Sequence, residues 1–429
     1  MKELKEVLPY QELSEGIQKR QSIHLHGLIP EAYPLLLASL FEETRENFLV
    51  LTENERSAKK LAEEINLLLP GKAYWYPAQS MNFYNLRSLD DEGRRLRLKT
   101  LMALAKKRPM MVISSLRALR NKISTKKAFQ RECLCLDLDF EGEIEEISKK
   151  LLFLRYRPVQ RVEAVGDFSI RGGILDIFPA HEELPVRIEF FDTQIDSIRK
   201  FSVEDQRSLE NIQEVSIGPG TEIIFSAEEL AEAGKGLSQD LSQGLKKTGV
   251  DLNRLEDKFS NLIDAVNTGN YLENPELLVP YLKAESYGVL TDYFETVFTM
   301  DLGNLYTMAQ GEERAFMEDV SYQMEKGEAM FSHQRMIFST EEIFGHLRKK
   351  TLVNLELLMK PTKLFQAEKL IYFQGIEAEK FHRKLDLFLE RIEAYVKEEY
   401  KIYLYIGDFG KQETILKLLQ EKHLPVFGQ

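Results

Sequence analysis

The feature that most constrains the fold is an alternation of short apolar runs with longer helical patterns in the first quarter of the chain. Apolar runs at Ser22–His26, Asn47–Leu51 and Met110–Ser114 have the length of buried strands. Helical patterns, and one more strand pattern, fall between them: Glu31–Thr44, Glu53–Leu69, Ala73–Tyr76 and Asp91–Lys107. Strands separated by helices at this spacing predict a parallel sheet covered by helices.

The pattern changes near Phe129 to one that is rich in strands. Gly172-Gly173 between two of the runs is a strong signal for a turn or a bulge. The candidate strands are Val159–Val165, Phe168–Ile170, Ile174–Phe178, Val186–Phe191 and Ile195–Phe201. Helical patterns return after Gly218-Pro219-Gly220. The sequence therefore predicts a β-rich α+β module inserted into an α/β lobe.

The C-terminal part has the pattern of a second, small α/β domain. Strand patterns at Leu370–Phe373 and Lys401–Ile406 alternate with helical patterns at Ile376–Glu399 and Lys411–Lys422. Leu424–Gln429 has the pattern of a strand that has just begun, so we expect the chain to be a fragment. The predicted segments are 1–127 and 215–348 for the lobe, 128–214 for the inserted module and 349–429 for the small domain.

Composition narrows the class of protein. No apolar run approaches the ~18 residues that a membrane span needs, so no membrane partner is expected. Two cysteines, Cys133 and Cys135, give no disulfide framework and indicate a reducing cytoplasm. The 57 basic and 69 acidic residues give a net charge of −12, which disfavours a protein that reads the nucleic-acid backbone along its whole surface.

A phosphate-binding loop is expected after the first strand of such a lobe, where backbone N–H groups would hold phosphates and a lysine would meet the last one. Gly27 begins a loop of the right length, but Ala32 replaces the second glycine and Tyr33 the lysine. Pro34 stands at the hydroxyl position and removes an N–H donor. The loop is therefore predicted to be a degenerate nucleotide site, and no cofactor is expected.

The acidic motif that would hold magnesium is degenerate as well. The strand Thr296–Met300 ends in Asp301, but Leu302 stands where a glutamate would activate water. An aspartate at a strand end is more often a cap or a turn residue. The missing groups of the phosphate loop and the missing glutamate are independent observations, and both predict that this lobe does not hydrolyse a nucleotide.

The cysteines and histidines that could form a metal centre or act as a nucleophile are better interpreted as residues with structural roles. Cys133 and Cys135 alternate on a strand and are expected to be small hydrophobic residues on one face. His24 and His26 lie on a buried strand, where a hydrogen-bonded core histidine is more common than a metal ligand. No metal and no catalytic residue is predicted.

Two basic clusters remain. The stretch from Arg87 to Arg108 has an apolar helical face and is most simply a solvated helix, with a DNA-binding surface as the alternative. In the β-rich module, arginines occur close to acidic and aromatic residues: Arg155, Arg157, Arg161, Arg171, Glu163, Asp167, Tyr156, Phe168 and Phe178. Arginines with aromatics are typical of protein–protein contact surfaces. An exposed sheet face with cross-strand ion pairs explains them equally well.

The same module carries a series of motifs: Tyr156–Val159, Gly166–Pro179, Pro185–Asp192, Ile198–Phe201 and Gln206–Ser208. In this order they closely resemble the N-terminal region of the bacterial transcription-repair coupling factors, whose first three domains are similar to the excision-repair protein UvrB. The resemblance is specific in the module and extends in order over the whole chain.

The resemblance implies a fold and a role. The leading and returning segments would form one degenerate helicase-like lobe that has lost its nucleotide site, in agreement with Tyr33, Pro34 and Leu302. The stretch around Asn82–Asn85 would lack the long hairpin with which UvrB probes damaged DNA. The β-rich module would bind UvrA, the damage-recognising ATPase.

By position, Arg157, Arg171 and Phe178 match the arginines and the phenylalanine of the surface that UvrB-like proteins present to UvrA. Ser169 stands where such sequences commonly carry another arginine. The resemblance places the polymerase-binding domain and the ATP-driven DNA translocase of the parent protein beyond residue 429. RNA polymerase and double-stranded DNA would thus be partners of the parent, and this chain a non-catalytic adaptor. The alternative is a UvrB-like DNA-binding helicase or ATPase.

Overall fold

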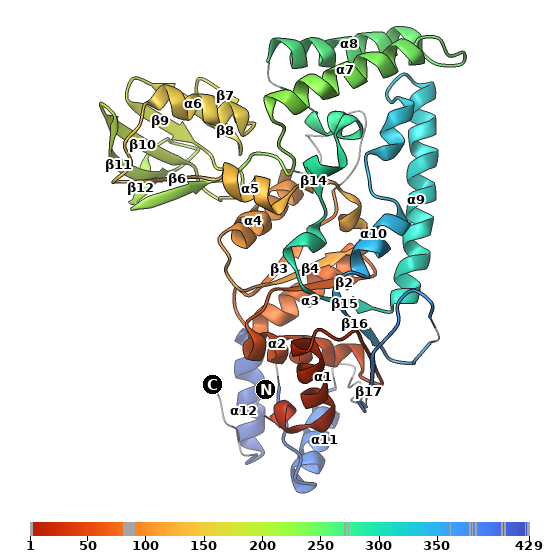
Figure 1. Cartoon of the computed structure of the whole chain (residues 1–429). Helices are drawn as coiled ribbons and strands as arrows, with labels where there is room; N and C mark the ends of the chain where they lie inside the picture. The colour runs from red at the N-terminus through yellow and green to blue at the C-terminus, as the bar shows by residue number, and fades with distance from the viewer. Residues whose placement is uncertain are drawn as a thin grey trace.

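The computed structural model of the chain describes residues 3–79, 91–269, 272, 274–360, 362–376, 379, 381, 384–404, 406, 409–424 and 426. It contains a seven-stranded parallel sheet and a separate six-stranded sheet (Figure 1). The predicted class, an α/β lobe with a distinct β-rich module, is confirmed. Within the described residues no helix is long and apolar enough to cross a bilayer.

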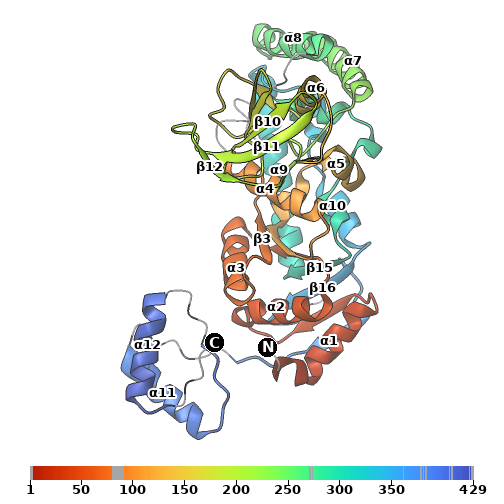
Figure 2. The ribbon, with the colours of Figure 1, turned by 90° about the vertical axis from the view of Figure 1, so that its left-hand side faces the viewer.

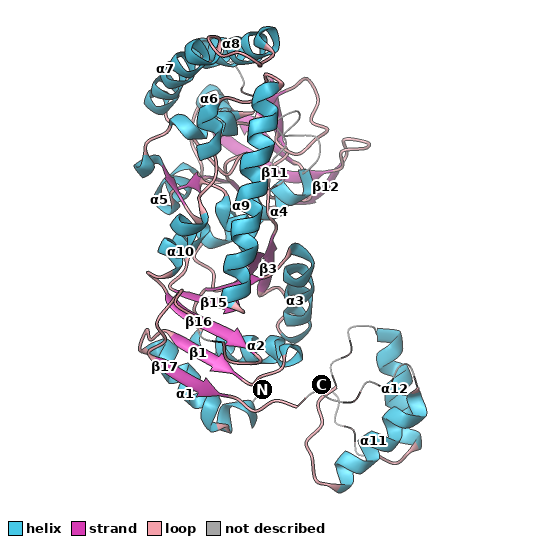
Figure 3. Ribbon diagram, turned by 90° about the vertical axis from the view of Figure 1, so that its right-hand side faces the viewer, coloured by secondary structure: helices cyan, strands magenta, loops and turns pink. Residues whose placement is uncertain are grey.

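The large sheet has the strand order β17-β1-β16-β15-β2-β4-β3, and every neighbouring pair is parallel. Its strands are β1 (Ile23–His26), β2 (Phe48–Thr52), β3 (Ala73–Tyr76), β4 (Met111–Ser115), β15 (Thr296–Met300), β16 (Thr351–Glu356) and β17 (Lys369–Tyr372). Because β16 and β17 follow residue 348, the sheet extends beyond the boundary that the sequence suggested for the lobe. Figure 3 shows its strands side by side.

Helices cover both faces of this sheet because side chains alternate along its strands. On β2, Val50 packs with helices α1, α2 and α3, whereas Leu49 and Leu51 pack with α4, α9 and α10. The helices are α1 (Leu8–Gln18), α2 (Tyr33–Thr44), α3 (Glu55–Leu68), α4 (Asp91–Ala105), α9 (Leu302–Glu325) and α10 (Thr340–Leu347). On α4 the expected apolar face is confirmed, with Leu98, Leu101 and Met102 buried. Arg87, Asn82–Asn85 and their neighbours lie outside the described residues.

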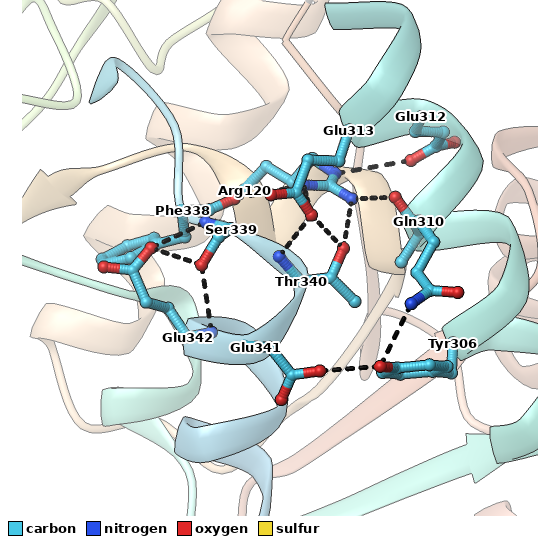
Figure 4. A network of polar contacts seen from close by, with 11 residues as sticks. Arg120, Tyr306, Gln310, Glu312, Glu313, Phe338, Ser339, Thr340, Glu341 and Glu342 are labelled. Carbon is cyan, nitrogen blue, oxygen red and sulfur yellow. Dashed lines mark hydrogen bonds and ion pairs between the residues drawn. The ribbon is translucent and has the colours of Figure 1, made fainter. Parts of the chain in front are cut away.

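A network around Arg120 ties the leading segment of the lobe to the returning one (Figure 4). The buried guanidinium follows β4 and donates to the carbonyl oxygens of Ala309 and Phe338 and to the hydroxyl of Thr340. Glu313 accepts from the backbone N–H of Thr340 at 2.8 Å and lies 4.0 Å from the guanidinium. One side chain from the first part of the chain thus holds α9 and α10 in place.

The six-stranded sheet has the order β12-β11-β10-β9-β8-β7. Its strands are β7 (Arg157–Pro158), β8 (Asp167–Arg171), β9 (Ile174–Ile177), β10 (Val186–Phe191), β11 (Gln194–Phe201) and β12 (Ser208–Asn211). The prediction of a strand over Val159–Val165 was wrong. There the Asp167 carboxylate accepts from the backbone N–H of Ala164, and Gly166 has a φ of 85°, which holds a loop.

The two ends of the module meet in a short antiparallel pair. Strand β6 (Leu134–Asp137) pairs with β13 (Glu214–Ile217), so the chain leaves the lobe and returns to it at one place. Helices α5 (Lys126–Glu132) and α6 (Ile144–Phe153) flank this entry. The inner face of the sheet shares one apolar cluster with the lobe. The exact segment boundaries stay a prediction.

The remaining helices form two further units. Helices α7 (Ala227–Gly244) and α8 (Leu252–Thr268) pack with short 3-10 helices in a cluster of their own. In Figure 2, α11 (Leu385–Lys397) and α12 (Phe409–Glu421) stand apart from the large sheet and share a small core. No strand forms among the described residues of 401–406, and β17 pairs with β1 of the large sheet. The assignment of 349–429 to a small α/β domain stays a prediction.

Candidate functional site

The outer face of the six-stranded sheet carries Arg157 and Arg171, two of the residues that the sequence singled out. Strand alternation directs Leu175 and Ile177 of β9 into the core that is shared with the lobe. The residues between and beside them therefore point outward. Asp176 of β9 stands directly opposite Arg187 of β10 and Ser169 of β8. This register places Arg187, Asp176 and Arg171 next to one another on the outer face, and we call these three residues the charged ladder.

Asp176 is the centre of the ladder. Its carboxylate is 1% exposed and accepts from two arginines. Arg187 donates from Nε at 2.7 Å and from Nη2 at 2.9 Å, and Arg171 donates from Nη2 at 2.8 Å. The hydrogen bond to Asp176 raises the pKa of Arg187. A buried carboxylate with two charge-assisted partners fixes the position of both guanidinium groups.

Arg157 repeats the arrangement one strand further on. Its Nε lies 2.9 Å from Oδ1 of Asp167, a residue that is 2% exposed. The other Asp167 oxygen accepts from the backbone N–H of Ala164 at 3.0 Å. The side chains of Arg157 and Arg171 remain 51% and 56% exposed. The buried aspartates thus orient both guanidinium groups, and solvent or a partner protein can still reach them.

The aromatic residues of this cluster are not exposed. Phe178 is 8% exposed and packs with Val162 and Phe201 in a small cluster that is separate from the main core. Phe168 belongs to the main core. Tyr156 is buried, and its hydroxyl donates to the carbonyl of Gly218. Phe178 therefore supports the face, and a direct contact by its ring stays a prediction.

Sequence reasoning misplaced one arginine and missed another. Arg155 has a φ of 69° and turns away from this face toward Glu276, and burial lowers its pKa. Arg161 lies beside Glu163 at 3.4 Å. Arg187 was missed, although the alternation Val186-Arg187-Ile188-Glu189 places it on the polar face. Ser169 is buried and donates to the carbonyl of Gln160.

The loop after β1 is filled by the protein itself. Gly27 has a φ of 90°, and its backbone lies against Tyr372 and Phe373, where an added Cβ would clash. Tyr33 is 5% exposed at the start of α2. Burial, followed by the charges of Glu356, Asp301 and Glu31, raises the pKa of its phenol to about 12. Gly27 is thus packed against the β17 segment, and the Tyr33 phenol lies among carboxylates.

Asp301 is a helix cap. Its side chain accepts from the backbone N–H of Asn304 at 3.0 Å and from Lys360 Nζ at 2.6 Å. Leu302 is buried, and its N–H donates to the side chain of Asn354. The prediction of a cap is confirmed.

The other candidates have structural surroundings. His24 is buried and lies 3.1 Å from the Glu356 carboxylate, which confirms the prediction of a hydrogen-bonded core histidine. Cys133 is half-buried, and burial raises the pKa of its thiol to about 11. Cys133 ends α5 and only Cys135 lies on β6, where it is exposed, so the expectation of two small hydrophobic residues on one strand face was wrong. Among the residues with assigned structure, no group of three metal-ligating side chains is found.

Comparison with known proteins shows what the β-rich module and the whole chain are similar to. Residues 134–223 match the family described as the UvrB interaction domain, so the β-rich module is UvrB-like. The transcription-repair-coupling factor of Bacillus subtilis strain 168 is 26% identical over 92% of this chain and 34% of its own length. That of Staphylococcus aureus strain bovine RF122 / ET3-1 is 25% identical over 98% and 36%.

The resemblance to the N-terminal region of transcription-repair coupling factors is thereby confirmed. The chain spans about a third of the length of these relatives.

Proposed function

We propose that this chain is a non-catalytic adaptor that binds UvrA through the outer face of its β-rich module. Arg157 and Arg171 provide the contact, each oriented by a buried aspartate. The observation that carries the proposal is this pairing of exposed guanidinium groups with carboxylates that are 2% and 1% exposed. Preorganised arginines at protein interfaces lose little freedom when they bind, which makes them effective contact residues.

The lobe would serve as a scaffold and hydrolyse no ATP. Three features of the described residues support this part of the proposal. Tyr33 occupies the lysine position and is buried, Pro34 lacks an N–H, and Asp301 is engaged as a cap by Asn304 and Lys360. Glu356 adds a buried negative charge that would repel a phosphate.

In the parent protein the adaptor would bring excision repair to an RNA polymerase stalled at a lesion. RNA polymerase and double-stranded DNA would then be bound by regions outside this chain. The setting would be the bacterial cytoplasm, where a lone exposed thiol such as Cys135 stays reduced.

Calorimetric titration of the chain with purified UvrA tests the proposal, and an assay of ATP turnover by the chain alone accompanies it. We expect saturable binding and no turnover above a buffer control. Absence of binding would contradict the adaptor role. Turnover that follows the concentration of the chain would favour the helicase or ATPase alternative.

A further inference from the structure

A hollow of about 450 Å³ lies where the lobe meets the β-rich module. Its lobe side is formed by β3 and α4, and Figure 1 shows α4 between the module and the large sheet. Its module side is formed by the loop His181–Leu184, between β9 and β10, and by Lys200 of β11. Hollows of this volume hold small ligands in many proteins.

The wall of the junction hollow has more positive than negative side chains. Lys99, Lys106, Arg108 and Lys200 reach it, whereas Glu182 and Glu183 are its carboxylates. Glu183 is paired, at 3.3 Å from Lys99 and 3.6 Å from Arg95.

Lys200 is also paired, at 2.6 Å from Glu210. Lys106 and Arg108 are exposed and form no ion pair with any residue that the structure describes. Two cations of the wall are thus available to a ligand.

A buried histidine at the same wall has an unused ring nitrogen. His181 is 7% exposed, and its Nε2 lies 3.4 Å from the Glu182 carboxylate. Its Nδ1 has no hydrogen-bond partner among the described residues. The hydrogen bond from His181 and the charges of Lys200 and Lys106 hold the pKa of Glu182 below its usual range.

We propose that the junction hollow binds a phosphate group. Lys106 and Arg108 would make charge-assisted hydrogen bonds to the phosphate oxygens. Tyr74 and Met102 form an apolar part of the wall that suits the remainder of a phosphate ester. The phosphate could come from a free phosphate ester or from the backbone of a nucleic acid, since both present the same oxygens.

The inference is independent of UvrA recruitment. Arg157 and Arg171 do not line the junction hollow. A ligand there would contact α4 of the lobe and the His181–Leu184 loop of the module at once. It would therefore add to the contacts between the two units.

The test uses two probes on the whole chain at low ionic strength. Pyrophosphate is titrated by calorimetry, and a fluorescently labelled DNA duplex is titrated by anisotropy over a range of salt concentrations. The double variant Lys106→Ala, Arg108→Ala removes the two available cations. The variant Lys149→Ala, Lys235→Ala removes the same charge from exposed positions outside the hollow and is the control. Thermal melting checks that both variants fold.

We expect pyrophosphate to bind the wild-type chain, and the Lys106, Arg108 variant to weaken that binding at least about tenfold while the control does not. Duplex binding that weakens in the same variant, with a shallower salt dependence, identifies a nucleic-acid backbone as the source. Pyrophosphate binding without duplex binding identifies a free phosphate ester. Failure of both probes to bind, or equal weakening in the two variants, would overturn the proposal.

Discussion

Two regions of the molecule bury different parts of their polar groups: the carboxyl end of β1 in the large sheet, and the outer face of the β-rich module. At the carboxyl end of β1, the loop after Gly27 is packed against the β17 segment, and Tyr33 is buried among carboxylates. On the module face, the carboxylates of Asp167 and Asp176 are buried, and arginines lie above them with half of their surface exposed.

Under the proposed function, this difference separates a surface that a partner can contact from one that is closed to it. Under the proposed function, the loop after Gly27 no longer binds phosphate, and close packing against the protein's own side chains stabilises it. A contact surface keeps its donors outside and uses buried acceptors to orient them. The account therefore predicts that the buried acids determine stability and that the exposed arginines determine binding.

The largest effect is expected from Asp176→Ala. This change leaves Arg187, which is mostly buried, without its anionic partner. Breaking one side of such a pair costs ~3–5 kcal/mol of unfolding free energy. Urea denaturation of the whole chain measures it. The control is Asp205→Ala, which removes an exposed acid beside Arg207 and is expected to change stability by less than ~0.5 kcal/mol.

Phe178→Ala is expected to lower the unfolding free energy by ~3 kcal/mol, because it opens a cavity beside Val162 and Phe201. Phe178→Leu fills most of that space and should retain both stability and UvrA affinity. Denaturation and calorimetry on the two variants separate the roles. A stable Phe178→Leu variant that no longer binds UvrA would show that the ring itself is a contact.

The substitutions Tyr33→Lys and Pro34→Thr together restore two groups of a phosphate-binding loop. We expect no ATP hydrolysis, because Tyr372 and Phe373 still close the loop and Glu356 still repels phosphate. A lysine at a site that is 5% exposed should also cost ~2 kcal/mol of stability. Colourimetric phosphate release measures turnover, and hydrolysis gained by this variant would mean that the loop is open.

The smallest effect at neutral pH concerns the Tyr33 phenol, whose pKa is raised to about 12 by burial and by three carboxylates. In the unfolded chain it would titrate near ~10. The stability that the neutral phenol contributes is therefore complete below pH ~10 and is lost as the pH rises toward 12. Difference spectra between the wild-type chain and Tyr33→Phe report this pKa. Titration near 10 would show a solvated loop.

The sequence predicted the main architecture because strand and helix periods are local signals. It did not predict β16, and it assigned the residues of β17 to another unit, since no local pattern says which sheet a late strand joins. The residues Lys401–Ile406 have a strand-like composition, yet the described ones form no ladder, because a strand also needs a neighbour to pair with.

Part of the candidate site was also predictable from local sequence patterns. The exposure of Arg157 and Arg171 follows from the polar side of alternating strands. The burial of Phe178 does not, because Val162 and Phe201 cover it from separate parts of the chain. Arg155 lies just after α6 with a left-handed backbone, outside the six-stranded sheet, and its residue type gives no sign of such a conformation.

The most direct test of the central claim is the affinity of UvrA for the double variant Arg157→Ala, Arg171→Ala, measured by calorimetry beside urea denaturation. Arg207→Ala, which removes an exposed arginine of the same module, is the control. The account predicts that the double variant loses ~2 kcal/mol or more of binding free energy, roughly thirtyfold in affinity. Its unfolding free energy should fall as well, because the buried Asp167 carboxylate keeps only backbone N–H donors, so the urea curve must show that the variant is folded under the titration conditions. Undiminished UvrA binding by a folded double variant would contradict the claim that these arginines form the contact.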